Sequence, residues 1–299
     1  MTRSPHPAFL RRPVNVVLGA GGVKGVAHIG AIRCFEEFRL KVSCYWGASV
    51  GSLVAAFASN GYTAAEMHSI FLSEEFRRPG WEIWSRMLHL LNPMAWLLKP
   101  LEQFWAPPGG LIDLKPWFEH ICRVYDLKPN ERLKIVACDA LTGKPVVFAG
   151  DSYDLPAALA ASGAVAGVFA SQLLPETQAH SDPMGIGPFG AHVLIDSFYY
   201  RQIPADLVPE PAIVSKLGRC TALPTEPLFP ADFFLHLKEM FEGPLIDAVY
   251  PDPQGDHLIV DTGMPEVSGM SFGLSQRKLQ QQTEYGYRQM KDALEAIAA

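Results

Sequence analysis

Residues 47–51 read Gly-Ala-Ser-Val-Gly, a G-x-S-x-G pentapeptide between two apolar stretches. A short apolar run precedes it, as expected for a buried strand, and Leu53–Ala58 has the apolar character of a buried helix. Strand, sharp turn and helix is the setting that presents the serine of a nucleophile elbow. Gly47 and Gly51 leave room for a turn that a Cβ would obstruct. The sequence therefore predicts Ser49 as a nucleophile at a helix N-terminus, where free N–H groups favour negative charge.

The pentapeptide alone is a weak signal, because three common residues at fixed spacing recur by chance. A second match, Gly269–Gly273, occurs near the end of the chain. No strand leads directly into it, and little chain follows that could supply a base. We interpret Ser271 as a loop serine, so Ser49 needs support from the rest of the sequence.

Length and composition restrict the class of protein. A chain of 299 residues with 48% hydrophobic and 19% charged residues can bury a large core in one α/β domain. A net charge of −6 argues against a nucleic-acid partner. Five cysteines without a C-x-x-C pair favour reduced thiols and a cytoplasmic location. We expect no signal peptide and no membrane-spanning stretch.

A glycine-rich turn, Gly19–Gly25, lies between a predicted strand at Val14–Leu18 and a predicted helix at Val26–Phe38. Such a turn presents backbone N–H groups to an anion. A dinucleotide fingerprint fails because Lys24 occupies the third glycine position, and a phosphate-binding P-loop motif is absent. The remaining anion is the oxyanion of an acyl-transfer intermediate. Two parallel strands joined by one helix would bring this turn and Ser49 to the same edge of a sheet.

Further elements follow from the apolar pattern. Strands are expected at 135–138, 146–148, 192–195, 212–214 and 257–260, and helices at 155–161 and 275–298.

Three motifs in order resemble those of patatin-like phospholipases. Ala20–Gly30 resembles the family's oxyanion loop, and residues 47–51 resemble its nucleophile elbow. The third motif is an Asp-Gly-Gly or Asp-Gly-Ala turn after a strand, and here the strand His192–Ile195 leads to Asp196. The chain departs from the family at the next two positions, Ser197 and Phe198. Glycines there allow unusual backbone angles, so we expect a turn in ordinary φ/ψ space with the phenyl ring directed away from Ser49.

The resemblance extends from about residue 14 to 290 and includes Ala161–Phe169, which looks like the family's segment ahead of the strand that bears the aspartate. It implies a three-layer α/β/α fold with a largely parallel sheet, as one domain over 1–299 with its motifs in about 14–205. It also implies a calcium-independent hydrolase, without cofactor or metal, that cleaves phospholipid, lysophospholipid or other acyl esters.

The resemblance assigns roles to individual residues. Ser49 would form an acyl intermediate, and Asp196 would act as its base in a dyad without histidine. The amides of Gly21 and Gly22 would hold the oxyanion. A supporting role falls to four further motif residues, Lys24, Gly25, Gly47 and Gly51. A carboxylate with an ordinary pKa near 4 is a poor base for a serine hydroxyl, so burial that raises its pKa would help.

Plainer interpretations stay open for several of these residues. Lys24 could shape the loop, add positive potential, or be a solvated loop cation. Asp196 could cap a strand end. His257 would complete a Ser-Asp-His order like that of α/β-hydrolases, but too few strands precede Ser49, so we interpret it as a strand-start residue. We interpret His28 as structural.

The segment 81–110 is rich in aromatic residues and broken by prolines, and it holds four of the six tryptophans. It could form ordinary core helices. Tryptophan also suits a surface between apolar and aqueous surroundings, which favours a lid over the acyl site and weak peripheral contact with membranes.

Two rival functions remain. An acyltransferase could use the same serine, although Ala48 stands where the malonyl-transferase-like branch favours histidine. A catalytically dead lipid-binding protein is supported by Ser197 and Phe198, which replace the family's glycines.

Overall fold

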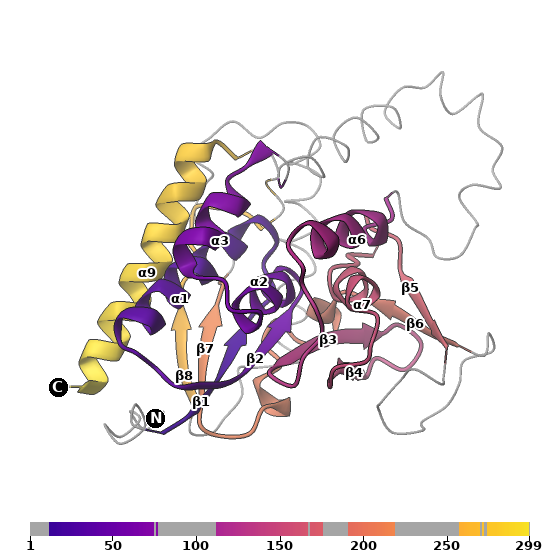
Figure 1. The fold of residues 1–299 in the computed structure, drawn as a ribbon, viewed down its shortest axis with the longest axis horizontal. Coiled ribbons are helices and arrows are strands. Elements are labelled where there is room, and N and C mark those ends of the chain that lie inside the picture. Colours follow the sequence, from indigo (N-terminus) through magenta and orange to yellow (C-terminus); the bar gives the residue numbers. More distant parts are fainter. Residues whose placement is uncertain are drawn as a thin grey trace.

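The computed structural model describes residues 12–74, 76, 112–166, 168–175, 191–218, 257–269, 271 and 274–298. The strands of this part form one 8-stranded sheet (Figure 1). They are β1 (Val14–Leu18), β2 (Val42–Ala48), β3 (Leu133–Asp139), β4 (Pro145–Phe148), β5 (Gln172–Pro175), β6 (Ala191–Ile195), β7 (Ala212–Lys216) and β8 (His257–Asp261).

The order across the sheet is β5-β6-β3-β2-β1-β7-β8, and β4 pairs with β3 outside this path. The five strands from β3 to β8 in this order run parallel. The other pairs, β3 with β4, β3 with β6 and β5 with β6, are antiparallel. Parallel neighbours need long crossover connections, which helices supply here. The predicted α/β class with a largely parallel central sheet flanked by helices is confirmed.

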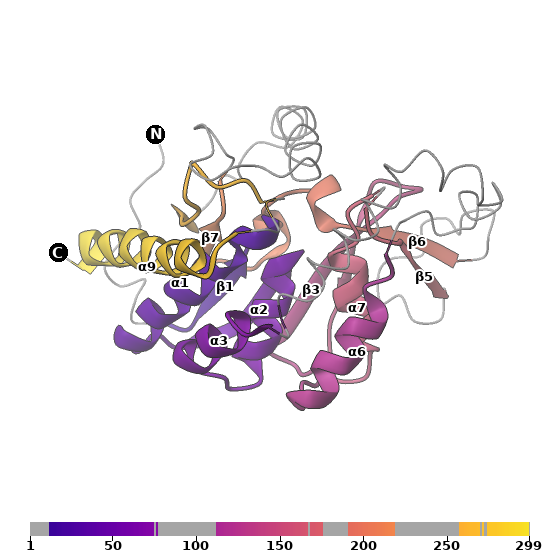
Figure 2. The same cartoon turned by 90° about the horizontal axis from the view of Figure 1, so that it is seen from above.

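Helices α1, α2, α6 and α7 gather on one side of the sheet, and α9 lies alongside α1 (Figure 2). The helices of the described part are α1 (Val26–Glu37), α2 (Val50–Ser59), α3 (Ala64–Phe71), α6 (Lys115–Val124), α7 (Leu155–Ser162) and α9 (Gln276–Ala298). Three short 3-10 helices accompany them, η2 (Gly22–Gly25), η5 (Ser197–Tyr199) and η6 (Ala205–Leu207).

Both faces of β1 are buried, which explains its unbroken apolar sequence. Val14, Val16 and Leu18 pack into the large core shared with the helices. Val17 points to the opposite face, where it packs in a second cluster with residues from 203–208. The sheet therefore has apolar packing on each side of its central strand.

Local signals set the helix starts. Thr63 and Glu66 form a capping box at the start of α3, each side chain bonding the other residue's backbone. The Asp154 side chain accepts from the Ala157 N–H at the start of α7, and Pro156 occupies the first turn, where its missing N–H costs nothing.

The strands and helices predicted from the apolar pattern are confirmed, with ends shifted by one or two residues. The proposed lid at 81–110 lies outside the described residues. In the part of the chain that the structure describes, no helix has the length and apolar character needed to cross a bilayer.

The aromatic side of the main core gives a test of this packing. Phe57 on α2 is fully buried and meets Tyr62 and Phe71 edge to face, at 5.0 and 5.5 Å between ring centroids. Replacing Phe57 with alanine leaves a cavity, so the free energy of unfolding should fall by about 3–5 kcal/mol. Urea unfolding measures it, with Val124→Ala on the exposed side of α6 as the control. A loss below about 1 kcal/mol would contradict the packing described.

Candidate active site

Ser49 connects β2 to α2 in an unfavourable backbone conformation. Its φ is 53° and its ψ is −126°, and the residue occupies the N-cap position of α2. A non-glycine residue held at such angles costs on the order of 1–3 kcal/mol. The side chain is only partly buried, so a substrate can reach it. This geometry is the sharp strand-to-helix turn that a nucleophile elbow requires.

The two glycines of the pentapeptide are required by close backbone approaches. A Cβ on Gly47 would collide with the backbone of Ser52 in the first turn of α2. A Cβ on Gly51 would collide with the Leu18 carbonyl at the end of β1. The first contact tightens the elbow, and the second holds the start of α2 against the glycine-rich turn that follows β1.

Both backbone groups of Ser49 are held by neighbouring residues. The Ser162 hydroxyl accepts from the Ser49 N–H at 2.9 Å and donates to the Val136 carbonyl at 2.6 Å. The Ser52 N–H donates to the Ser49 carbonyl at 2.9 Å, and the Ser52 hydroxyl bonds the same carbonyl. Ser162 is fully buried at the end of α7. These bonds offset the strain at the elbow.

Sequence reasoning did not give Ser162 a role. The available signal was the resemblance of Ala161–Phe169 to a family segment, but only the three-dimensional packing of α7 brings this hydroxyl to the elbow.

Asp196 follows β6 and contacts the Ser49 side chain directly. The Ser49 hydroxyl donates to Asp196 Oδ2 at 2.6 Å, and the Phe198 N–H donates to Oδ1 at 2.8 Å. The aspartate is 1% exposed, and its own N–H donates to the Ala164 carbonyl at 2.9 Å. The carboxylate is therefore fixed in position, with one oxygen directed at the serine.

The turn after Asp196 uses ordinary backbone angles. Ser197 and Phe198 belong to η5, and positive φ among the described non-glycine residues occurs only at Arg39, Ser49 and Asp126. The short bond between Ser49 and Asp196 leaves no space for the Phe198 ring between them. The prediction of ordinary φ/ψ angles at this turn is confirmed, and the ring does not lie between Ser49 and Asp196.

The glycine-rich turn is anchored on both sides of Gly21 and Gly22. The N–H groups of Gly19 and Ala20 donate to the carbonyls of Ser215 and Gln202, and those of Val23 and Lys24 donate to Gly269 and Gly21. Within the described chain, the N–H groups of Gly21 and Gly22 donate to no protein acceptor. Both glycines are partly exposed. Two adjacent amides are thus left available for an anion.

Gly22 needs the freedom of glycine. Its φ is 54°, and a Cβ there would collide with the Gly269 carbonyl. Ser271 lies in the same loop between β8 and α9, so its interpretation as a loop serine is confirmed. The second G-x-S-x-G match therefore begins with a glycine that supports the glycine-rich turn.

Lys24 is buried with 0% exposure, and its ammonium donates to the Gly218 carbonyl at 2.7 Å. The interpretation as a solvated loop cation is wrong, because the side chain extends into the protein and bonds the backbone after β7. A loop-shaping role fits this contact.

His28 lies beneath the same turn and is structural, as interpreted from sequence. Its Nε2–H donates to the Gly19 carbonyl at 2.9 Å, which leaves Nδ1 to accept from the Ser215 hydroxyl at 2.8 Å. Ser215 in turn bonds the Thr262 hydroxyl at 2.7 Å. Complete burial lowers the pKa of His28 to about 4, against the opposing effect of the Gly19 hydrogen bond. The neutral ring thus ties β1, α1, β7 and the end of β8 together.

His257 is the first residue of β8, as interpreted, and pairs with Ala212 at the amino edge of the sheet. Ser49 stands at the carboxyl edge, after Ala48. The structure therefore does not bring His257 to the Ser49–Asp196 pair. Among the described residues, no group of three or more His, Cys, Asp or Glu side chains is placed to hold a metal ion.

Comparison with known proteins gives one extensive match. The profile of the family described as Patatin-like phospholipase matches residues 16–250. The curated lysophospholipase NTE1 of Pyricularia oryzae is 38% identical over 85 residues, which are 28% of this chain and 6% of that protein. The uncharacterized protein YqhO of Bacillus subtilis is 39% identical over 57 residues, 19% of this chain and 20% of that protein. The matched stretches thus span only a small part of these relatives.

Two solved structures have a weak likeness to the chain. VipD from Legionella pneumophila has a TM-score of 0.46 at 12% identity, covering 95% of this chain and 67% of VipD. The ExoU–SpcU complex from Pseudomonas aeruginosa has a TM-score of 0.41 at 14% identity, covering 99% of this chain and 52% of the matched chain.

Ser162 should affect the reactivity of Ser49 without touching its side chain. Ser162→Ala removes the acceptor for the Ser49 N–H, and one lost bond of this kind costs about 1–2 kcal/mol. The rate constant for labelling of Ser49 by a fluorophosphonate should fall about 10-fold. Ser59→Ala is the matched control, because the Ser59 hydroxyl also bonds a backbone carbonyl, that of Ala56 near the far end of α2. Equal labelling rates for the two variants would refute this positioning role.

His28 should make stability depend on pH. The folded pKa near 4 is below the unfolded value near 6.5, so the unfolded chain binds more protons between these values. The contribution of neutral His28 to the free energy of unfolding is complete above pH 6.5. About 3 kcal/mol of this contribution is lost as the pH falls towards 4. Denaturant unfolding at pH 7.0 and 4.5 should show a smaller loss of stability for His28→Gln than for the original protein. The same loss in both proteins would contradict the buried neutral ring.

Proposed function

This chain belongs to the patatin-like phospholipase family, and we propose that it is a lipid acyl hydrolase that cleaves carboxylic esters through an acyl-Ser49 intermediate. The observation that carries the proposal is the 2.6 Å hydrogen bond from the Ser49 hydroxyl to Asp196. Nucleophile and base within hydrogen-bond reach are the signature of an activated serine.

In the first half of the reaction, Ser49 Oγ attacks the ester carbonyl carbon while its proton moves to Asp196 Oδ2. The carbonyl oxygen becomes an oxyanion, for which the N–H groups of Gly21 and Gly22 are the proposed donors. The N-terminus of α2 adds a favourable dipole. Donors fixed before the reaction lower the barrier because they need no reorganisation when charge develops.

Collapse of this intermediate breaks the bond between the carbonyl carbon and the leaving alkoxide, which takes the proton from Asp196 and departs as an alcohol. A water molecule then attacks the acyl-Ser49 ester and gives a proton to Asp196. The second collapse releases the fatty acid, and the proton returns to Ser49 Oγ. Each proton transfer uses the same carboxylate, so the cycle closes.

A carboxylate is a weak base for a serine hydroxyl, and the fixed position of Asp196 beside Ser49 compensates for this weakness. Asp196 is buried, and the Phe198 N–H fixes its orientation. Pre-aligned reacting groups supply several kcal/mol of a barrier without any change of reagent.

The rival reading as a dead lipid-binding protein loses its main support. It depended on Ser197 and Phe198, and the turn that contains them keeps Asp196 bonded to Ser49.

The substrate class, setting and architecture are parts of the same proposal. Lysophospholipid or phospholipid is the proposed substrate, in keeping with the name of the Pyricularia oryzae relative. Every step above is assigned to a group of this chain, so we propose calcium independence. We further propose that 81–110 caps the acyl site of a single catalytic domain, and that weak apolar contact brings the enzyme to lipid surfaces.

Substitution of the dyad tests this function. Ser49→Ala should abolish ester hydrolysis, and Asp196→Asn should lower kcat by at least about 10²-fold, because it removes a positioned base. His257→Ala is the control and should retain most activity, since His257 lies at the opposite edge of the sheet. Release of p-nitrophenol from a short acyl ester and of fatty acid from lysophosphatidylcholine provides the measurement. If His257→Ala is as inactive as Ser49→Ala, a histidine triad replaces the dyad.

A further inference from the structure

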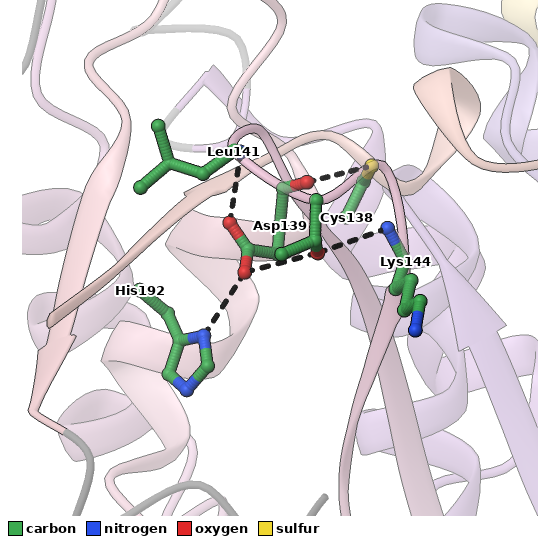
Figure 3. A network of polar contacts seen from close by, with 6 residues as sticks. Cys138, Asp139, Leu141, Lys144 and His192 are labelled. Atoms are coloured by element: carbon green, nitrogen blue, oxygen red, sulfur yellow. Dashed lines mark hydrogen bonds and ion pairs between the residues drawn. The ribbon is translucent and has the colours of Figure 1, made fainter. Parts of the chain in front are cut away.

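A pair formed by a carboxylate and an imidazole lies at the same edge of the sheet and has no part in the proposed reaction. Asp139 is the last residue of β3, and His192 lies in β6 (Figure 3). His192 Nδ1 is 3.0 Å from Asp139 Oδ2, and the side chains are 11% and 3% exposed, respectively. The carboxylate is thus buried, while the imidazole reaches the surface.

The contacts of Asp139 show that the histidine is not needed to close the turn. Oδ1 accepts from the Leu141 N–H at 2.9 Å, and Oδ2 accepts from the Thr142 hydroxyl at 3.2 Å. The Asp139 N–H also donates to the Lys144 carbonyl at 2.9 Å. These bonds already hold the turn between β3 and β4 in place. The further bond from His192 to Asp139 therefore serves to orient the imidazole ring.

The bond to Asp139 fixes which nitrogen remains available. Nδ1–H donates to the carboxylate, and Nε2 lies on the other side of the ring, away from Asp139 (Figure 3). No residue of the described chain bonds Nε2. An imidazole oriented by a buried carboxylate, with one nitrogen open, is arranged to bind a further group.

The position of the pair relates it to the dyad. Side chains two residues apart on a strand share a face, so His192 and Leu194 follow one side of β6, and Asp196 comes directly after the strand. Asp139 pairs with Leu194 and lies on that side as well. His192 and Asp196 are four residues apart in the sequence, which corresponds to about 13 Å at the rise of a strand. The phosphate of a glycerophospholipid lies several bonds from its ester. The lipid between ester and phosphate, together with the length of the imidazole side chain, can therefore bridge the separation between the dyad and the backbone of His192.

We propose that His192, held by Asp139, binds the phosphodiester group of a lipid whose ester lies at Ser49. The inference depends on the proposed function and assigns two residues of this chain to the phosphate of its lipid substrate. In the proposed complex the ring donates through both nitrogens, Nδ1–H to Asp139 and Nε2–H to a phosphate oxygen. A hydrogen bond between charged partners is stronger than a neutral one. His192 is then a specificity residue, and Asp139 is its positioning residue.

Direct binding tests this site without requiring catalysis. The background is Ser49→Ala, and the two probes are an ether-linked monoalkyl glycerophosphocholine and the monoalkyl glycerol with the same chain, each below its micelle concentration. His192→Gln should weaken binding of the phosphocholine probe at least about 10-fold, as expected for loss of a charged hydrogen bond. Asp139→Asn should also weaken binding of the phosphocholine probe. Neither substitution should change binding of the alkyl glycerol. His257→Gln is the matched control, because His257 faces Glu210 at 3.9 Å at the other edge of the sheet.

Three outcomes would overturn the inference. They are equal weakening of both probes by His192→Gln, no weakening of the phosphocholine probe, and no binding of that probe to Ser49→Ala. Retained binding of the alkyl glycerol shows that a variant is folded. Failure of the proposed function is a separate result, the absence of ester hydrolysis by the protein with Ser49 and Asp196 intact.

Discussion

The backbone of Ser49 is the constraint on which the site depends. A φ of 53° in a non-glycine residue persists only where its surroundings enforce it. Ser162 holds the N–H, and Ser52 holds the carbonyl. Gly47 allows the chain to turn tightly from β2 into α2, and Gly51 allows the end of β1 to approach the start of α2. The result is a hydroxyl directed at Asp196 from the start of a helix. Part of the folding free energy is thus used to keep the proposed nucleophile in place before any substrate binds.

The glycine-rich turn Gly19–Gly25 is fixed by residues from distant parts of the chain. Gln202 follows the turn that contains Asp196 and bonds Ala20, so the segment that carries the proposed base also holds the glycine-rich turn. The Lys24 ammonium anchors the turn to the Gly218 carbonyl, and His28 bonds the Gly19 carbonyl of the turn. Because their partners are buried, loss of any one leaves an unpaired polar group in the core, which is costly. The rigidity of the turn therefore comes from tertiary contacts more than from its glycines.

Sequence predicted the local features well. The sheet and helices follow from apolar periodicity, and Ser49 and Asp196 were selected by motif order, which the bond between them supports. The burial of Lys24 could not be predicted, because a charged residue in a glycine loop is usually solvated. The contacts of Ser162 and His192 were also beyond reach, since each joins residues far apart in sequence that meet only when the strands pair.

The central claim is that Ser49 becomes acylated during turnover. Acid quenching of the reaction with a slowly hydrolysed acyl ester, followed by peptide mass spectrometry, tests it most directly. The account predicts that the peptide containing Ser49 gains the mass of the acyl group, and that the adduct disappears when the substrate is exhausted. An adduct on another residue, or active turnover without any adduct at Ser49, would contradict it.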